Sequence, residues 1–126
     1  MIITEKNIKE LDQETLTLIK EALINAVDNK AFDGEVDLSY NHLIYNYYTV
    51  DAALEIGVKT DPAPIAGVYA ELTLVGDGST TPTFHYTMLS MPDSSTYDST
   101  LGTLNKVGVY YDGTSVFYTI TAITQN

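Results

Sequence analysis

The hydrophobic periodicity of this chain changes near residue 30, and this change limits the possible folds more than any other feature of the sequence. Before residue 30, apolar residues recur every three or four positions, which places them on one face of an α-helix. From residue 35 onward, apolar and polar residues alternate, as in a strand with one buried face. The sequence therefore predicts an α+β chain that is mainly β, with a helical segment over 1–30 and a β domain over 31–126.

Two helix starts are visible in the N-terminal segment, each with a Thr or Asp at the N-cap and apolar residues at N′ and N4. The first consists of Ile3, Thr4 and Ile8, and the second of Leu11, Asp12 and Leu16. This arrangement is a hydrophobic staple, so we expect a short helix over 5–11 and a main helix over 13–28.

The apolar stripe of the main helix is wider than a coiled-coil seam. Leu16, Ile19 and Leu23 lie along it and are candidate interface residues. Such a stripe needs a broad surface to cover. That surface is either a sheet of the same chain or copies of the helix in an oligomer, and the sequence leaves both possibilities open.

Turn-forming residues divide the rest of the chain into six to seven expected strands. The expected strands cover about 35–40, 50–58, 65–75, 83–91, 107–111 and 114–123. The aromatic-rich stretch 42–48 is either a further strand or the start of a helix. A connector is expected at Asp61–Pro64, a turn into a returning strand at Gly76–Gly78, and a polar surface loop at Pro92–Thr100. This pattern predicts an antiparallel β-sandwich or barrel after the N-terminal helix.

A β-hairpin is predicted at the C-terminal end of the chain. Asp112 and Gly113 separate two runs of alternating residues. An Asp-Gly pair in this position is typical of a two-residue type I′ turn, in which both residues have positive φ.

The segment 105–118, with the sequence NKVGVYYDGTSVFY, resembles the terminal hairpins of small bacteriophage virion proteins such as head fibres, capsid decoration proteins and tail-fibre modules. In those hairpins a strand ending in an aromatic-Asp-Gly-Thr turn returns through further aromatic residues. Their returning strand usually carries a Trp, where this chain has Val116-Phe117-Tyr118. The resemblance implies a non-enzymatic homo-oligomer, with a trimer favoured, that is made in the host cytoplasm and joins other proteins in the virion. It implies no catalytic residue.

Charge and cysteine content exclude several classes of partner and chemistry. The 17 acidic and 6 basic residues give a formal net charge of −11. This balance argues against nucleic acid and against an anionic membrane surface, because both require neutralisation of phosphates. The sequence contains no apolar run long enough for a membrane span and no secretory signal pattern. Without Cys, disulfides, thiol chemistry and thiolate metal sites are excluded.

Catalytic and metal motifs are not found. The chain has no Gly-x-Ser-x-Gly elbow, no HExxH and no Gly-rich phosphate loop, and we expect no enzyme and no cofactor. His42 and His85 are each expected as partly exposed sheet residues. An EF-hand aligned on Gly34 is excluded, because Ala31 and Tyr40 would occupy ligand positions. A looser calcium site among surface carboxylates stays open.

Ten Tyr residues and no Trp are more aromatic surface than one small core needs. Tyr combines a large contact area with a polar tip, so the surplus fits a protein interface, a sugar-stacking surface or the capping of a sheet rim. The candidate interface tyrosines are Tyr47, Tyr48, Tyr97, Tyr110 and Tyr111. The sequence thus predicts a non-enzymatic structural component of a virus or phage particle that acts through protein assembly. The alternative is a module that binds a glycan or a cell-surface ligand.

Overall fold

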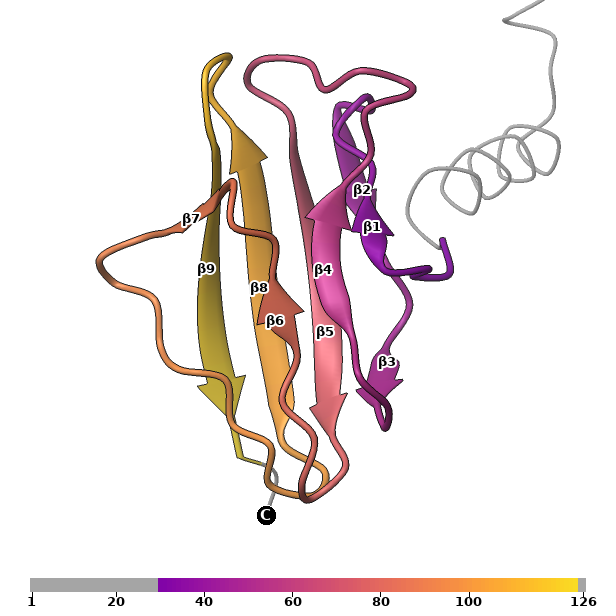
Figure 1. Ribbon diagram of the computed structural model, residues 1–126, viewed down its shortest axis with the longest axis vertical. Coiled ribbons are helices and arrows are strands. Elements are labelled where there is room, and N and C mark those ends of the chain that lie inside the picture. Colours follow the sequence, from indigo (N-terminus) through magenta and orange to yellow (C-terminus); the bar gives the residue numbers. More distant parts are fainter. Residues whose placement is uncertain (1–29, 125–126) are drawn as a thin grey trace, which may run out of the picture.

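The computed structural model describes residues 30–124, which form nine β-strands and, within that range, no helix (Figure 1). The mainly β character predicted from the sequence is confirmed. The helices expected over 5–11 and 13–28 lie outside the described residues, as do Leu16, Ile19 and Leu23. The domain boundary near residue 30 stays a prediction.

Three strands of eight residues form the centre of the structure, and the other strands are shorter. The strands are β1 (Glu35–Val36), β2 (His42–Ile44), β3 (Tyr48–Val50), β4 (Glu55–Val58), β5 (Tyr69–Gly76), β6 (Thr83–Phe84), β7 (Met88–Ser90), β8 (Leu104–Tyr111) and β9 (Val116–Ile123). The larger sheet has the order β2-β5-β8-β9-β7, and β3 also pairs with β5. The smaller sheet has the order β1-β4-β6.

The prediction of an antiparallel fold is wrong, because both sheets contain parallel pairs. β5, β8 and β9 pair antiparallel, whereas β2, β3 and β7 join that sheet in parallel and all pairs of the smaller sheet are parallel. The reason is the path of the chain. From β4 to β7 each connection crosses to the other sheet. No parallel pair joins consecutive strands: the partners β3 and β5, β4 and β6, and β7 and β9 are separated by one strand in sequence, and β1 and β4, and β2 and β5, by two.

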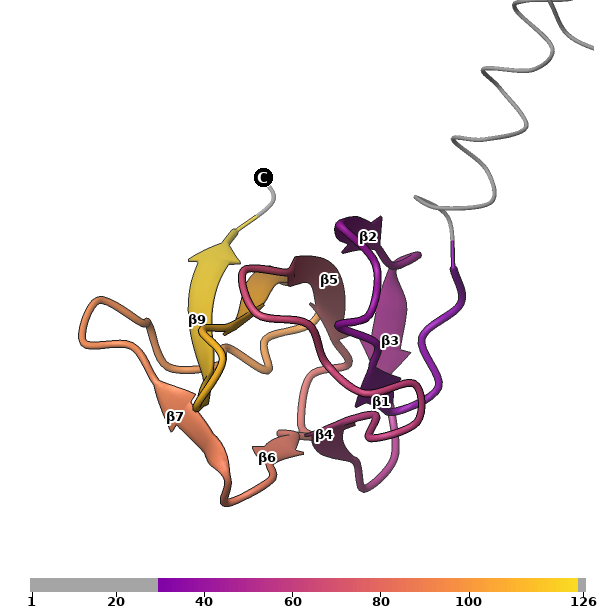
Figure 2. The same ribbon diagram turned by 90° about the horizontal axis from the view of Figure 1, so that it is seen from above.

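The two sheets face each other across the core. Figure 2 shows β4 and β6 on the side of the molecule opposite β5 and β8. They remain two separate sheets in residues 30–124, so the expected barrel alternative is also wrong. The buried core residues are Phe32, Val36, Leu38, Leu43, Tyr45, Val50, Ile56, Val68, Ala70, Leu72, Leu74, Met88, Val107, Val109 and Ile120. Burial of these side chains is the main stabilising contribution to such a domain.

Two expected strands are interrupted. The run 50–58 breaks between β3 and β4, where Asp51–Ala53 are exposed. The run 83–91 splits into β6 and β7, because a turn closed by the hydrogen bond from Met88 N–H to the His85 carbonyl at 2.9 Å separates them. Tyr86, which strict alternation along 83–91 would place on the same face as Phe84, lies in this turn and is exposed. The strand after Gly76–Gly78 therefore does not return beside β5, whose antiparallel partner is β8.

The predicted C-terminal hairpin is confirmed, but its turn differs from the prediction. Tyr111 pairs with Val116, so the loop has four residues, and only Gly113 in it has a positive φ, at 101°. Asp112 Oδ1 accepts hydrogen bonds from the backbone N–H groups of Thr114 and Ser115, both at 2.7 Å. The type I′ assignment is wrong because the Asp112 carboxylate organises the turn by capping these two groups instead.

The loop expected at Pro92–Thr100 is present, since this stretch contains no strand or helix. Several hydrogen bonds attach it to the larger sheet, including one from the Ser95 N–H to the Ile120 carbonyl at 2.8 Å. The Ser94 hydroxyl accepts a hydrogen bond from the Ile120 N–H at 2.9 Å, and Asn105 binds both backbone groups of Asp98 at 2.9 Å. The expected connector at Asp61–Pro64 is also present as a loop, in which the Asp61–Pro62 peptide bond is cis.

Candidate functional site

The outer face of the larger sheet, which points away from the core, carries a row of aromatic and apolar side chains. Strand register places these residues side by side across the sheet: His42, Tyr69, Tyr110, Phe117 and Leu89. Their sequence neighbours Ala70 and Val109 point inward and are fully buried, as the alternation of a strand requires. We call these five residues the aromatic row. Tyr69 and Tyr110 are 42% and 43% exposed, so the row is open to ligands.

Beside the aromatic row, Gly108 leaves a gap in the outer face. Gly108 pairs with Glu71 on one side and Thr119 on the other. A hollow of about 310 Å³ opens over it. The walls of this hollow are formed by Tyr69, Met91, Val109, Tyr110, Phe117, Tyr118 and Thr119. Val109 and Tyr118 pack toward the core, and the remaining large side chains, Tyr69, Met91, Tyr110 and Phe117, are aromatic or aliphatic, so the hollow offers apolar contact.

A second, more polar hollow of about 320 Å³ adjoins the first, because both are lined by Gly108 and Thr119. Its polar side chains come from Tyr47, Glu71, Thr73, Lys106, Thr119 and Thr121. We call the two hollows together the outer groove. Along β8 the outward positions are Lys106, Gly108 and Tyr110, so the groove has a polar end, a gap and an aromatic end.

The polar end of the outer groove is ordered by contacts within the protein. The Lys106 ammonium donates a hydrogen bond to Thr73 Oγ1 at 2.9 Å and lies 5.0 Å from the centre of the Tyr47 ring. At the edge of the sheet formed by β2, the centres of the His42 and Tyr69 rings are 4.2 Å apart, and His42 Nε2 is 3.9 Å from Glu71 Oε1. These contacts hold donors and acceptors in place before a ligand arrives, which lowers the entropic cost of binding.

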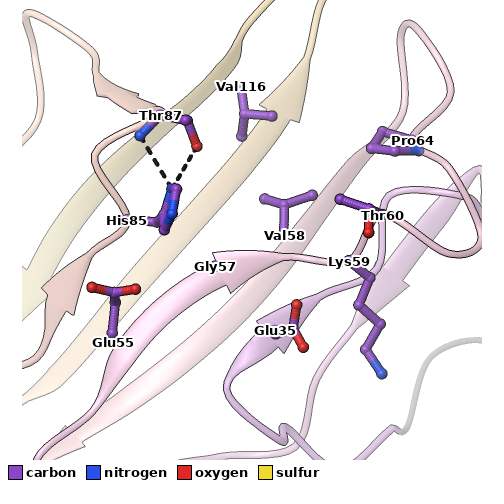
Figure 3. Close-up of a pocket in the computed structure, with 10 residues that line it drawn as sticks. All are labelled: Glu35, Glu55, Gly57, Val58, Lys59, Thr60, Pro64, His85, Thr87 and Val116. Carbon is purple, nitrogen blue, oxygen red and sulfur yellow. Dashed lines mark hydrogen bonds between the residues drawn. The ribbon is translucent and has the colours of Figure 1, made fainter.

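A larger hollow of about 470 Å³ lies beside the smaller sheet (Figure 3). Four of its lining side chains can carry charge, and they are Glu35, Glu55, Lys59 and His85. Lys59 donates a hydrogen bond to Asp33 at 2.9 Å. This bond raises the pKa of Lys59 and lowers that of Asp33. The amine therefore stays protonated and is a poor base or nucleophile at neutral pH.

His85 in the same hollow is engaged in a local turn. Its Nδ1 accepts the Thr87 N–H at 3.3 Å and lies 2.7 Å from Thr87 Oγ1, as the dashed lines in Figure 3 show. His85 is partly exposed, as expected, although it lies just after β6 and not within a strand. Glu35 and Glu55 are exposed, and in residues 30–124 no ion pair joins them to His85. The outer groove is therefore the stronger candidate site.

The structure separates the candidate tyrosines into two groups. Tyr47 and Tyr110 lie on the outer groove, and Tyr47 is 62% exposed. Tyr48, Tyr97 and Tyr111 instead pack against the core. Tyr48 makes an edge contact with Phe32, and the Tyr111 hydroxyl donates to the Gly113 carbonyl. Burial raises the pKa of Tyr97, and the negative charges of Asp77 and Asp98 act in the same direction.

Tyr69, Gly108 and Phe117 are among the groove residues that were not singled out from the sequence. Alternation indicated that Tyr69 faces away from Leu72 and Leu74, but not which residues lie beside it. The sequence does contain one indication of a gap. Gly108 lies two residues before Tyr110 and hence on the same face of the strand, and a glycine there has no side chain to fill that face.

In the described part of the chain no group of three His, Asp or Glu side chains is suited to hold a metal ion. Of the acidic residues Asp33, Glu35 and Asp37, which lie close together in sequence, Asp33 faces Lys59 and Asp37 faces Lys30. Residues 30–124 contain no helix with the length and hydropathy of a membrane span.

Comparison with known proteins gave no relative. No family model matches the chain, and neither the curated proteins nor the solved structures gave a match. The class of protein is therefore argued from the residues and geometry given above.

Proposed function

We propose that this chain is a non-enzymatic structural component of a virus or phage particle, such as a fibre, decoration or adaptor protein. The observation that carries the proposal is the outer face of the larger sheet, where most of the exposed large apolar side chains gather. On a soluble monomer, a contiguous apolar surface of this kind marks an interaction site. The resemblance of 105–118 to virion hairpins supports the same class, and this segment forms β8, the turn and the start of β9.

Assembly in this proposal depends on the N-terminal segment. The predicted stripe with Leu16, Ile19 and Leu23 provides an oligomerisation or docking surface, and the β domain presents the outer groove. The net charge of −11 opposes self-association, so salt should favour it.

Light scattering of the full chain at micromolar concentration tests the homo-oligomer. We expect a symmetric oligomer, with a trimer favoured, whose mass increases toward the full assembly as salt is added. Leu23→Ala should weaken it, whereas Leu101→Ala, a change at an exposed loop position, should leave it unchanged. A monomer at every salt concentration would contradict the oligomer. Failure to co-purify with particles from infected cells would contradict the virion role.

A second candidate function is a module that binds a glycan or cell-surface ligand. The outer groove favours it, because aromatic side chains and hydrogen-bonding groups lie together there. A panel of ester, phosphoester and glycoside substrates tests both candidates against an enzyme. We expect no turnover, and turnover of any of them would contradict both.

A further inference from the structure

We infer that the outer groove is a binding site for an uncharged saccharide, with one sugar ring seated over Gly108 between Tyr110 and Lys106. The inference rests on the second candidate function above and assigns it a site and a ligand class. Five features of the groove carry it.

The first feature is that Gly108 is not needed by the fold. Its φ is not positive, and a Cβ added to it would meet only the Thr119 methyl group, at an ordinary contact distance of 3.5 Å. A glycine inside a strand lowers stability, because it has greater freedom in the unfolded chain and no side chain to pack. The effect of having glycine at position 108 is therefore to keep space open in the outer groove.

The second feature is the aromatic end of the groove. Tyr110 pairs with both Tyr69 and Phe117, so three rings lie side by side across three strands. The face of an aromatic ring carries partial negative charge, and the C–H groups on one face of a sugar ring carry partial positive charge. Stacking of a sugar ring on these side chains thus combines apolar burial with favourable electrostatics.

The third feature is the mixture of groups at the polar end. Sugar hydroxyls both donate and accept hydrogen bonds, so a sugar site needs partners of both kinds. The Lys106 ammonium has donors beyond the one that it uses on Thr73, the Glu71 carboxylate accepts, and the Thr119 and Thr121 hydroxyls do both.

The fourth feature is charge. The groove is lined by one acidic residue, Glu71, and one basic residue, Lys106, and both come from the polar hollow. The site is therefore close to neutral, whereas the whole chain has a net charge of −11. A polyanionic glycan would be repelled by this field, so an uncharged saccharide is the better ligand.

The fifth feature is size. The two adjoining hollows, of about 310 and 320 Å³, match the lower range of small-ligand sites. The concave part of the face therefore has the volume of a site for a short saccharide.

The test uses the full chain and a panel of neutral oligosaccharides of glucose, galactose, mannose and N-acetylglucosamine, with binding measured by calorimetry and by saturation-transfer NMR. Gly108→Val fills the gap with a residue that favours strands and should lower affinity at least tenfold. Gly57→Val is the matched control, because Gly57 is a strand glycine of the smaller sheet whose added Cβ meets nothing within 4 Å. This control should bind as the original chain does.

A second pair of variants separates stacking from hydrogen bonding. Tyr110→Ala should reduce affinity about as strongly as Gly108→Val, whereas Tyr110→Phe keeps the ring and should retain most of the binding. The melting temperature of each variant shows that the domain remains folded.

The outcomes distinguish this site from the candidate function itself. Saccharide binding that persists unchanged in Gly108→Val would overturn the site but leave a glycan-binding function. No binding of any panel member would overturn both. If Gly108→Val converts an oligomer into a monomer, the face is an interface between copies of the chain, and the saccharide site is overturned.

Discussion

At the scale of single residues, the polar side chain with the clearest structural role is Asn105. It is fully buried in β8, where its amide group donates to the Asp98 carbonyl at 2.9 Å and its oxygen accepts the Asp98 N–H at the same distance. The Asn105 side chain thus satisfies the backbone N–H and carbonyl groups of Asp98, as a neighbouring strand would otherwise do. Buried polar groups that form such bonds are costly to remove, because their partners are left unsatisfied.

Replacing Asn105 by Ala should therefore lower the free energy of unfolding by about 1–3 kcal/mol. Urea denaturation measures this loss, and limited proteolysis should show faster cleavage in 92–100. Asn41→Ala is the control, because Asn41 is exposed and should change stability by less than about 0.5 kcal/mol. An equally small effect in Asn105→Ala would show that the loop does not depend on this clamp.

Gly76, at the end of β5, differs from Gly108 because the fold requires a glycine there. The backbone of another segment packs directly against it. A Cβ at Gly76 would collide with the Thr100 carbonyl oxygen and lie 2.8 Å from that of Ser99. Gly76→Ala should cost about 1–3 kcal/mol of stability, as expected for overpacking against backbone. Gly57→Ala, in open space within β4, should not lower the melting temperature in the same experiment and should raise it slightly, because a glycine inside a strand costs stability. Equal melting temperatures for the two variants would contradict this reason.

At the scale of strands, the sequence predicted which residues face inward but not which strands pair. Alternation in 65–75 placed Ala66, Val68, Ala70, Leu72 and Leu74 on one face. The last four are buried, whereas Ala66, which lies before the start of β5, is exposed. The partner of that strand was expected at 83–91, whereas it is β8. Periodicity is a local property, whereas the partner depends on connections that cross between two sheets. For the same reason the sequence indicated Tyr110 as a contact residue but could not place Tyr69 and Phe117 beside it.

The predicted helix over 13–28 is tested at the same scale. If it covers a sheet or a neighbouring subunit, Leu23→Ala should lower stability by roughly 2–5 kcal/mol. Deleting residues 1–30 should then lower the melting temperature as well. Losses below about half a kcal/mol in both would mean that the segment is a tether or a docking peptide and not part of the fold.

At the scale of the whole molecule, acidic side chains far apart in sequence share one property. Within residues 30–124, the carboxyl groups with a lowered pKa are Asp33, Asp37, Asp77, Asp98 and Asp112. Burial acts to raise the pKa of Asp37, but hydrogen bonds from Ser39 and the charges of Lys30 and Lys59 outweigh it. Backbone N–H groups in turns dominate at Asp77 and Asp112, led by those of Thr80 and Ser115. The folded domain thus prefers these groups ionised.

The stability of the folded domain should therefore decrease as the pH falls into the acid range. Each of these groups has a lower pKa in the folded state than in the unfolded state, so it stabilises the folded domain at pH values above its unfolded pKa of about 3.9. This stabilisation is lost as the pH falls through the folded pKa. We expect the melting temperature to decrease below about pH 4. Asp37→Asn should reduce stability at neutral pH and make the acid decrease shallower. A melting temperature that is constant down to about pH 2 would contradict this linkage.

The strand order also has a consequence for when the domain can fold during synthesis. β5 needs β8 as its antiparallel partner, and β7 needs β9, so strands made early complete their pairing only with strands made later. The β8–β9 hairpin is the local pair of the larger sheet and should form first once it has left the ribosome, because closing its short loop costs the least entropy. Until then, β5 can pair only in parallel with β2 and β3, and its other edge, which β8 covers in the folded domain, stays unpaired on the nascent chain.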